Sequence, residues 1–175
     1  TMKRILSILP TLADNSSNVI IEGETGTGKK LLARVIHGIG FRREKPFVTV
    51  NCAALPDDLL ESEIFGYKKG AFKGIQSDRQ GRFAQAKEGT IFINDIQEMS
   101  PTMQVKLLQV LQENCFWPIG ASQPVQLKAR VIVSSERDLA AEVTRKQFRK
   151  ALYYKLNIIR LSLPPLKNRR EDVPL

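Results

Sequence analysis

Histidine, cysteine and tryptophan are scarce in this chain, and their scarcity narrows the kinds of site that it can hold. The 175 residues include one histidine, two cysteines and one tryptophan. With His37 as the only histidine, a histidine-based metal site or a Ser–His triad within the chain has little support. Cys52 and Cys115 lack CxxC or metal-like spacing, so we expect two unpaired thiols and a reduced, cytoplasmic setting.

Long apolar runs are also lacking. No stretch approaches the roughly 20 residues that a membrane span needs, so we expect no membrane segment, and we expect no secretory leader. The content of 42% hydrophobic and 26% charged residues is typical of a folded globular protein. We therefore expect one domain over residues 1–175.

Acidic residues are outnumbered by basic ones, 18 against 27, which gives a net charge of +9. The basic residues are spread along the chain, and no helix-turn-helix or aromatic RNA-binding signature is present. A solvated surface with a phosphate ligand therefore explains the charge better than direct binding of DNA or RNA by this chain.

The most informative motif lies in residues 19–36. An apolar run at 19–21 leads into Gly23-x-x-x-x-Gly28-Lys29, and a helical pattern follows at 31–36. This order of strand, loop and helix favours a phosphate-binding loop over a plain glycine-rich turn. Lys29 would bring a positive charge to the β- and γ-phosphates. The residues predicted to bind the cofactor are Gly23, Glu24, Thr25, Gly26, Thr27, Gly28, Lys29, Lys30 and Leu31.

Strand-like and helix-like patterns alternate along the rest of the chain. The predicted strands are 19–21, 46–51, 90–94, 130–134 and 158–163. The predicted helices are 2–9, 31–36, 56–65, 100–111, 139–145 and 148–156, and 67–80 is predicted as a loop or loose hairpin. This alternation predicts an α/β domain with a parallel sheet flanked by helices.

Four segments together resemble one family, the AAA+ ATPase domain of NtrC-type bacterial transcription activators, which act on sigma-54 RNA polymerase. The segments read GETGTGKK (23–30), VNCAALPDDLLESEIFG (50–66), GRFAQAKEGTIFINDIQEM (81–99) and LYYKLNIIRLSLPPLKNRREDVPL (152–175). The resemblance implies an AAA+ P-loop NTPase core that binds ATP or ADP and self-associates as a ring or dimer.

The resemblance also implies neighbouring domains. Members often carry a sensory domain, as in two-component response regulators, and a DNA-binding domain. We expect this chain to be the α/β core of a longer regulator, with the helical lid and the DNA-binding domain outside it. The implied partners are RNA polymerase with a sigma factor, and DNA through the other domain.

Two departures from the family pattern concern Mg²⁺ and the attacking water. The family's Walker B strand ends Asp-Glu, whereas this one ends Asn94-Asp95, which leaves a weak metal site and a shorter carboxylate. Because side chains alternate along a strand, we expect these two to point to opposite sides, so that Asp95 does not replace the lost metal ligand. Lys30, where the family has Glu, further disfavours Mg²⁺ unless it points to solvent.

The loop that remodels sigma-54 holoenzyme in the family reads GAFTGA. Its counterpart here is the output loop, Gly70, Ala71, Phe72, Lys73, Gly74 and Ile75. A lysine at position 73 cannot reproduce the family's threonine hydroxyl, so sigma-54 engagement is doubtful. Two interpretations stay open: the loop contacts an acidic or nucleic-acid surface, or it has lost the function that it has in the family.

Four further positions carry family roles. Arg149 matches an arginine that reaches a neighbour's γ-phosphate, and Lys155 stands where a second arginine is usual. Ser135 keeps the hydroxyl of the sensor segment. Asn51 matches an asparagine that restrains the catalytic Glu, now Asp95. With Asn94 and Asp95, these residues form the predicted catalytic set.

Three hypotheses follow from this pattern. The favoured one is a nucleotide-binding regulatory module with weak or absent hydrolysis and impaired sigma-54 remodelling, because the phosphate-binding residues are intact while the catalytic and output residues are altered. The alternative is a hydrolysis-competent ATPase that remodels sigma-54 RNA polymerase holoenzyme. A more remote one is an interaction domain whose pocket stays empty.

Overall fold

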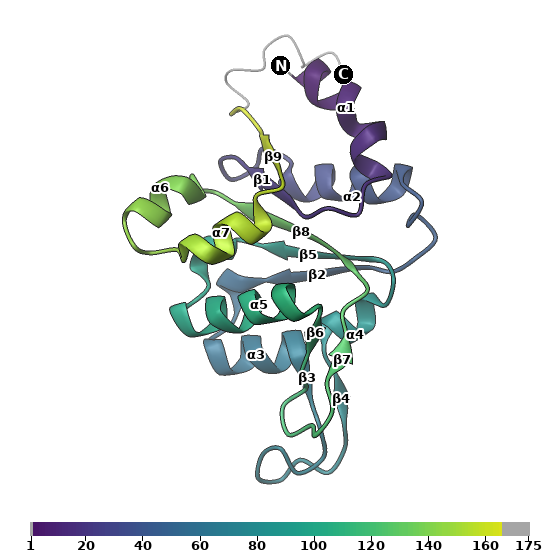
Figure 1. Cartoon of the computed structure of the whole chain (residues 1–175), viewed down its shortest axis with the longest axis vertical. Helices are drawn as coiled ribbons and strands as arrows, with labels where there is room; N and C mark the ends of the chain where they lie inside the picture. Colours follow the sequence, from purple (N-terminus) through teal and green to yellow (C-terminus); the bar gives the residue numbers. More distant parts are fainter. Residues whose placement is uncertain (1, 166–175) are drawn as a thin grey trace.

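A parallel five-stranded sheet forms the centre of the molecule, as the computed structural model shows for residues 2–165 (Figure 1). Its strands are β1 (Val19–Glu22), β2 (Phe47–Asn51), β5 (Thr90–Asn94), β8 (Arg130–Ser135) and β9 (Ile159–Ser162), in the order β2-β5-β8-β1-β9. Every neighbouring pair is parallel. The predicted α/β fold is therefore confirmed; residues 166–175, the end of the last family-like segment, lie outside the described residues.

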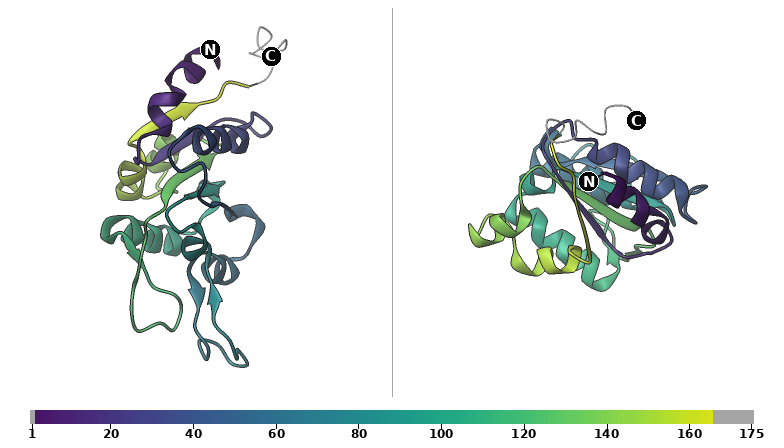
Figure 2. Two further views of the ribbon diagram at one scale, coloured as in Figure 1. Left: turned by 90° about the vertical axis from the view of Figure 1, so that its right-hand side faces the viewer. Right: turned by 90° about the horizontal axis from the view of Figure 1, so that it is seen from above.

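Helices cover both faces of the sheet (Figure 2). On one face, α1 (Met2–Ala13) and α2 (Lys29–Ile39) pack on a cluster that includes Val19, Ile21 and Phe92. The opposite face carries α3 (Asp57–Phe65), α4 (Arg82–Ala86), α5 (Pro101–Glu113), α6 (Leu139–Thr144) and α7 (Lys150–Leu156). Successive strand residues alternate between the two cores, and all four residues of β1, three of them apolar, are buried.

Two short hairpins extend from one end of the sheet, away from α1 (Figure 1). The first pairs β3 (Gly66–Tyr67) with β4 (Arg79–Gln80), which agrees with the loose hairpin predicted there. The second pairs β6 (Cys115–Phe116) with β7 (Val125–Gln126), and the sequence did not predict it. The backbone joins the two hairpins, because Ile119 N–H donates to Gly66 O at 2.9 Å and Lys68 N–H donates to Ile119 O at 2.9 Å.

Two 3₁₀ turns, η1 (Cys52–Ala54) and η2 (Ile96–Glu98), follow β2 and β5. Both cysteines are free thiols, as predicted, and burial raises the pKa of Cys52 to about 12. Within residues 2–165, no helix has the length and apolar character needed to cross a membrane.

Gly66 holds the base of the first hairpin, and we expect Gly66→Ala to destabilise the protein. Its backbone has φ 75° and ψ −178°, and an added Cβ would lie 2.3 Å from Arg79 O. Strain and collision together should lower the free energy of unfolding by more than about 2 kcal/mol. Gly74→Ala is the matched control, since Gly74 has φ 89° but open space around it, and it should cost only about 1 kcal/mol. Urea denaturation measures both; equal losses would contradict the role of the collision.

Candidate nucleotide-binding site

The loop between β1 and α2 has the geometry of a phosphate cradle. Gly26 and Gly28 adopt φ values of 79° and 92°, which L side chains rarely tolerate, and the predicted strand, loop and helix order is confirmed. Gly28 precedes the first residue of α2 without a side-chain cap, so the helix's first amides remain available to an anion. Lys29 is buried, and its ammonium donates to Gly23 O at 2.7 Å and Glu24 O at 3.0 Å. The cradle thus presents a fixed positive charge and backbone donors.

A cavity of about 370 Å³ opens beside this loop. Its lining consists of Thr25, Gly26, Gly28, Lys29, Lys30, Leu31, Asn94, Asp95 and Glu136. The structure therefore brings the predicted cofactor-binding loop and the predicted metal-site residues to one pocket. Lys30 lies on its wall and is exposed to solvent.

The expectation that Asn94 and Asp95 point to opposite sides is wrong. β5 ends at Asn94, and Asp95 already has a left-handed backbone with φ 56°, so the alternation of the strand no longer applies. The Asn94 amide donates to Asp95 Oδ2 at 2.6 Å, and the Ser134 hydroxyl donates to Asn94 Oδ1 at 2.6 Å. Both side chains face the same pocket, and both ends of the Asn94 amide are engaged.

The carboxyl of Asp95 is in an unfavourable environment for a negative charge. Burial raises its pKa, the carboxylate of Glu136 raises it further, and Lys29 opposes them. Its Oδ1 is buried and has no hydrogen-bond partner within residues 2–165. A buried acceptor without a partner is costly, and at a functional pocket it suggests a place for a water or ligand.

Glu136 is a pocket residue that the sequence reasoning did not select. Its Oε1 accepts a hydrogen bond from the Thr25 hydroxyl and lies 3.7 Å from the Lys29 ammonium. The signal in the sequence was the glutamate standing after Ser135, where the family commonly has Asn or His. Its contact with the phosphate loop spans 111 residues of sequence, so only the fold reveals it.

Ser135 and Asn51 each make local hydrogen bonds with the backbone that follows their strands. The Ser135 hydroxyl donates to Arg137 O at 2.7 Å and accepts from Arg137 N–H at 3.1 Å, so it shapes the turn after β8. Asn51 Oδ1 accepts from Ala53 N–H at 3.1 Å and thereby caps η1. Among the described residues, no hydrogen bond joins Asn51 to Asp95.

Arg149 and Lys155 lie away from the phosphate cavity. The Arg149 guanidinium donates to Pro101 O at 3.4 Å, and the residue lines a separate cavity between α5 and α7. Lys155 lines a third cavity near Asn18, whose amide donates to Lys155 O. Neither cation can therefore serve the phosphate pocket of its own chain in this arrangement.

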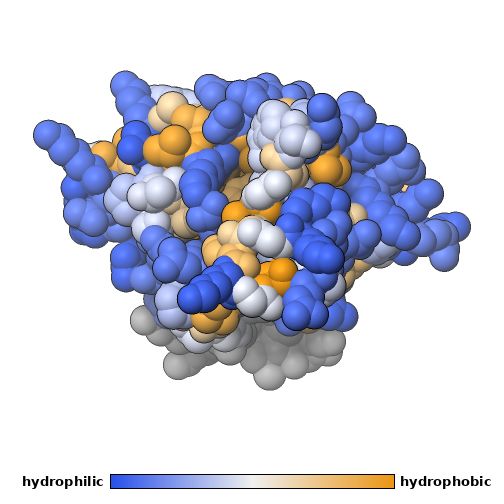
Figure 3. All heavy atoms as spheres, turned by 90° about the horizontal axis from the view of Figure 1, so that it is seen from below, coloured by the Kyte–Doolittle hydropathy of each residue, from blue (hydrophilic) through white to orange (hydrophobic). Residues whose placement is uncertain are grey.

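The output loop forms the exposed tip of the first hairpin. Gly70 N–H donates to Ile75 O at 3.1 Å, and the Phe72 ring packs edge-on against Tyr67 with 5.9 Å between ring centroids. Lys68 is paired with Asp78 at 2.7 Å, whereas Lys73 is exposed. Viewed from this end of the molecule, hydrophobic side chains gather among hydrophilic ones (Figure 3). The tip is thus basic and partly apolar.

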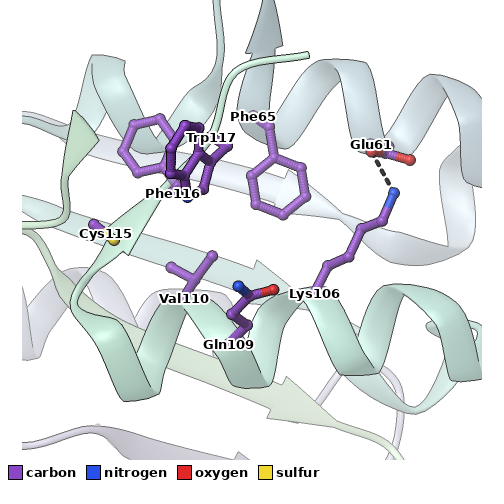
Figure 4. A pocket seen from close by; sticks show the side chains of 8 residues that line it. All are labelled: Glu61, Phe65, Lys106, Gln109, Val110, Cys115, Phe116 and Trp117. Carbon is purple, nitrogen blue, oxygen red and sulfur yellow. Dashed lines mark hydrogen bonds and ion pairs between the residues drawn. The ribbon is translucent and has the colours of Figure 1, made fainter. Parts of the chain in front are cut away.

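A smaller cavity of about 260 Å³ lies at the base of the hairpins (Figure 4). Its lining is Glu61, Phe65, Lys106, Gln109, Val110, Cys115, Phe116 and Trp117. The one cation there, Lys106, already pairs with Glu61, and the remaining lining is largely apolar. This cavity is therefore poorly suited to a phosphate group.

The fold and this pocket define a P-loop nucleotide-binding domain of the AAA+ class. The chain belongs to the sigma-54 interaction domain family, whose model matches residues 1–162. It is 48% identical over 174 residues to the transcriptional regulatory protein ZraR of Escherichia coli K12, and the match covers 99% of this chain and 40% of that relative. The chain thus spans about two fifths of that relative's length.

Solved structures show the same architecture. NtrX from Brucella abortus in complex with ADP matches with a TM-score of 0.90 and 30% identity, over 99% of this chain and 38% of that one. The ATP complex of NtrX matches with a TM-score of 0.88 and 30% identity, covering 99% and 39%. The P-loop NTPase domain of an E. coli sigma-54 activator matches with a TM-score of 0.63 at 21% identity, covering 94% and 95%, and shows the fold alone.

Proposed function

We propose that this chain is the nucleotide-binding core of a bacterial transcription regulator, that it binds ATP or ADP, and that it hydrolyses ATP slowly. The observation that carries the proposal is the contrast within one pocket. On one side Lys29 and the glycine loop form a complete phosphate cradle. On the other side stand a neutral Asn94 and a short Asp95. The NtrX complexes with ADP and ATP support binding of the same ligands here.

The residues fit the phosphates of a nucleotide better than they fit Mg²⁺. Asn94 lacks a negative charge and its amide oxygen already accepts from Ser134, while Lys30 adds a positive charge to the pocket where the family has Glu. Among residues 2–165, no group of three or more His, Cys, Asp or Glu side chains comes together to hold a metal. We infer that Mg²⁺ is held weakly and that Asp95, with its unpartnered Oδ1, would be its main ligand.

The proposal also covers self-association and the partners of the regulator. The exposed arginine at position 149, remote from its own pocket, suits contact with a neighbour's nucleotide in a ring or dimer. RNA polymerase with a sigma factor is the proposed partner of the output loop, and DNA would be bound by a domain outside this chain. Lys73 makes remodelling of sigma-54 holoenzyme weak.

The alternative, a hydrolysis-competent ATPase that remodels sigma-54 RNA polymerase holoenzyme, rests on one observation. Asp95 turns into the pocket beside Lys29, so a carboxylate is within reach of an attacking water in spite of its shorter side chain.

Lys29→Ala tests nucleotide binding. Removing the ammonium should weaken ADP and ATP binding by at least about tenfold, because phosphates lose a charge-assisted contact in the cradle. Isothermal titration calorimetry measures both affinities, with Lys87→Ala, a lysine outside the pocket, as the control. Equal affinity in the wild type and Lys29→Ala would contradict the proposed site.

A further inference from the structure

Glu136 is held in place by the backbone turn that follows β8. Ser135 fixes that turn through its two hydrogen bonds with Arg137, and Glu136 N–H donates to Gln97 Oε1 at 3.4 Å. The nearby arginine does not neutralise the carboxylate, since Arg137 pairs with Glu98 at 3.0 Å and with Glu142 at 3.6 Å. The Glu136 carboxylate is therefore free to face the phosphate loop.

Its contacts are those that a terminal phosphate would seek. The carboxylate accepts from the Thr25 hydroxyl and lies 3.7 Å from the Lys29 ammonium. In a phosphate loop this lysine serves the β- and γ-phosphates. The nucleotide phosphates and the Glu136 carboxylate therefore compete for the same cation.

A second carboxylate, that of Asp95, adds to the negative charge that a third phosphate would meet. Asp95 lines the same cavity, with its Oδ1 buried and without a hydrogen-bond partner among the described residues. A phosphate loop cradles the α- and β-phosphates, so a third phosphate extends past the cradle, where we expect its charge to approach both carboxylates. Like charges repel more strongly beside a partly buried carboxylate such as Asp95 than in bulk water, while Glu136, with 39% of its side chain exposed, is screened more.

We propose that Glu136 determines nucleotide selectivity, so that the pocket prefers a nucleoside diphosphate over the triphosphate. The inference rests on the proposed nucleotide-binding function and adds a specificity-determining residue to it. It predicts that the resting form of the protein holds the diphosphate when both nucleotides are present at similar concentrations.

The experiment compares the wild-type protein with Glu136→Gln by calorimetric titration of ADP and ATP in EDTA, where no divalent cation screens the carboxylates. Glutamine keeps an acceptor for the Thr25 hydroxyl and removes the charge. We expect wild type to bind ADP on the order of tenfold more tightly than ATP. In Glu136→Gln, the affinity for ATP should rise on the order of tenfold, and the affinity for ADP should change by less than about twofold. Glu88→Gln, which removes an exposed carboxylate outside the pocket, is the matched control and should leave the ratio unchanged.

The outcomes separate this inference from the function on which it rests. If ADP binds and Lys29→Ala abolishes its binding, but Glu136→Gln leaves the ATP to ADP ratio unchanged or lowers it, the selectivity role is wrong and the nucleotide site stands. If neither nucleotide binds to the folded wild type or to Glu136→Gln, the proposed function fails and this inference fails with it. Thermal unfolding of each variant confirms that it is folded.

Discussion

The double replacement Asn94→Asp with Asp95→Glu is expected to raise ATP turnover at least about 10²-fold above wild type. The expected gain has two sources in the pocket. An aspartate at 94 supplies the negative charge that a hydrated Mg²⁺ requires. A glutamate at 95 extends the carboxylate by one methylene toward the water that attacks the γ-phosphate.

The local hydrogen bonds support this expectation. Asn94 now holds the Asp95 carboxylate through its amide at 2.6 Å, and an aspartate at 94 has no donor with which to do so. The Ser134 hydroxyl, which donates to Asn94 Oδ1 at 2.6 Å, can donate equally to an aspartate oxygen. The replacement therefore frees the carboxylate at position 95 while keeping the contact that orients position 94.

Phosphate release by the purified protein at high concentration measures the effect. High concentration matters because Arg149 lies outside its own pocket and would act on a neighbour's nucleotide. ATP affinity of wild type and variant should agree within about threefold, since binding and catalysis depend on different contacts. The single variants and the double variant with Lys29→Ala serve as controls. Wild-type turnover of about 1 s⁻¹, an ordinary enzyme rate, would refute slow hydrolysis and favour the ATPase alternative.

The fold could be predicted because its signals are local. Each sheet strand is a short apolar run between turns, and the phosphate loop has its motif within eight residues, 23–30. The hairpin of β6 and β7 and the short helix α4 were not predicted, because two-residue strands and a five-residue helix give no readable periodicity. Tertiary contacts decide such elements.

The site could be predicted only in part. Six of the nine loop residues predicted to bind the cofactor line the pocket. The relative placement of Asn94 and Asp95 was not predicted, because strand geometry was extended by one residue past the end of β5. Glu136 reaches the pocket through the parallel order of β1 and β8, which brings their carboxyl ends to one edge of the sheet. A single sequence shows which residues follow each strand but not which of them meet.

Arg130→Met is expected to lower the free energy of unfolding by about 3 kcal/mol, because a buried guanidinium makes hydrogen bonds that no other group in its surroundings replaces. Arg130 begins β8 and is only 3% exposed. It donates to Leu12 O at 2.8 Å, Ala13 O at 3.3 Å and Ser17 O at 3.1 Å. Burial lowers the pKa of Arg130 to about 10, so the side chain stays charged at neutral pH.

These contacts join the end of α1 to the sheet. The last carbonyls of a helix lack partners within the helix, and a cation there also suits the negative end of the helix dipole. Methionine keeps most of the apolar stem but removes the guanidinium from the Leu12, Ala13 and Ser17 carbonyls, of which Leu12 O keeps the Asn15 N–H at 3.2 Å. We therefore expect α1 to lose hydrogen-exchange protection before the sheet does.

Urea denaturation gives the stability change, and hydrogen exchange followed by mass spectrometry locates it. Arg43→Met is the matched control, because Arg43 is exposed and pairs with the exposed Glu44 at 3.5 Å, and it should change stability by less than about 0.5 kcal/mol. The stability loss of Arg130→Lys should lie between those of Arg130→Met and Arg43→Met, because an ammonium keeps the charge but lacks the planar guanidinium that reaches three carbonyls. Equal stability of Arg130→Met and Arg43→Met would show that α1 is held by its apolar contacts with α2 and the sheet alone.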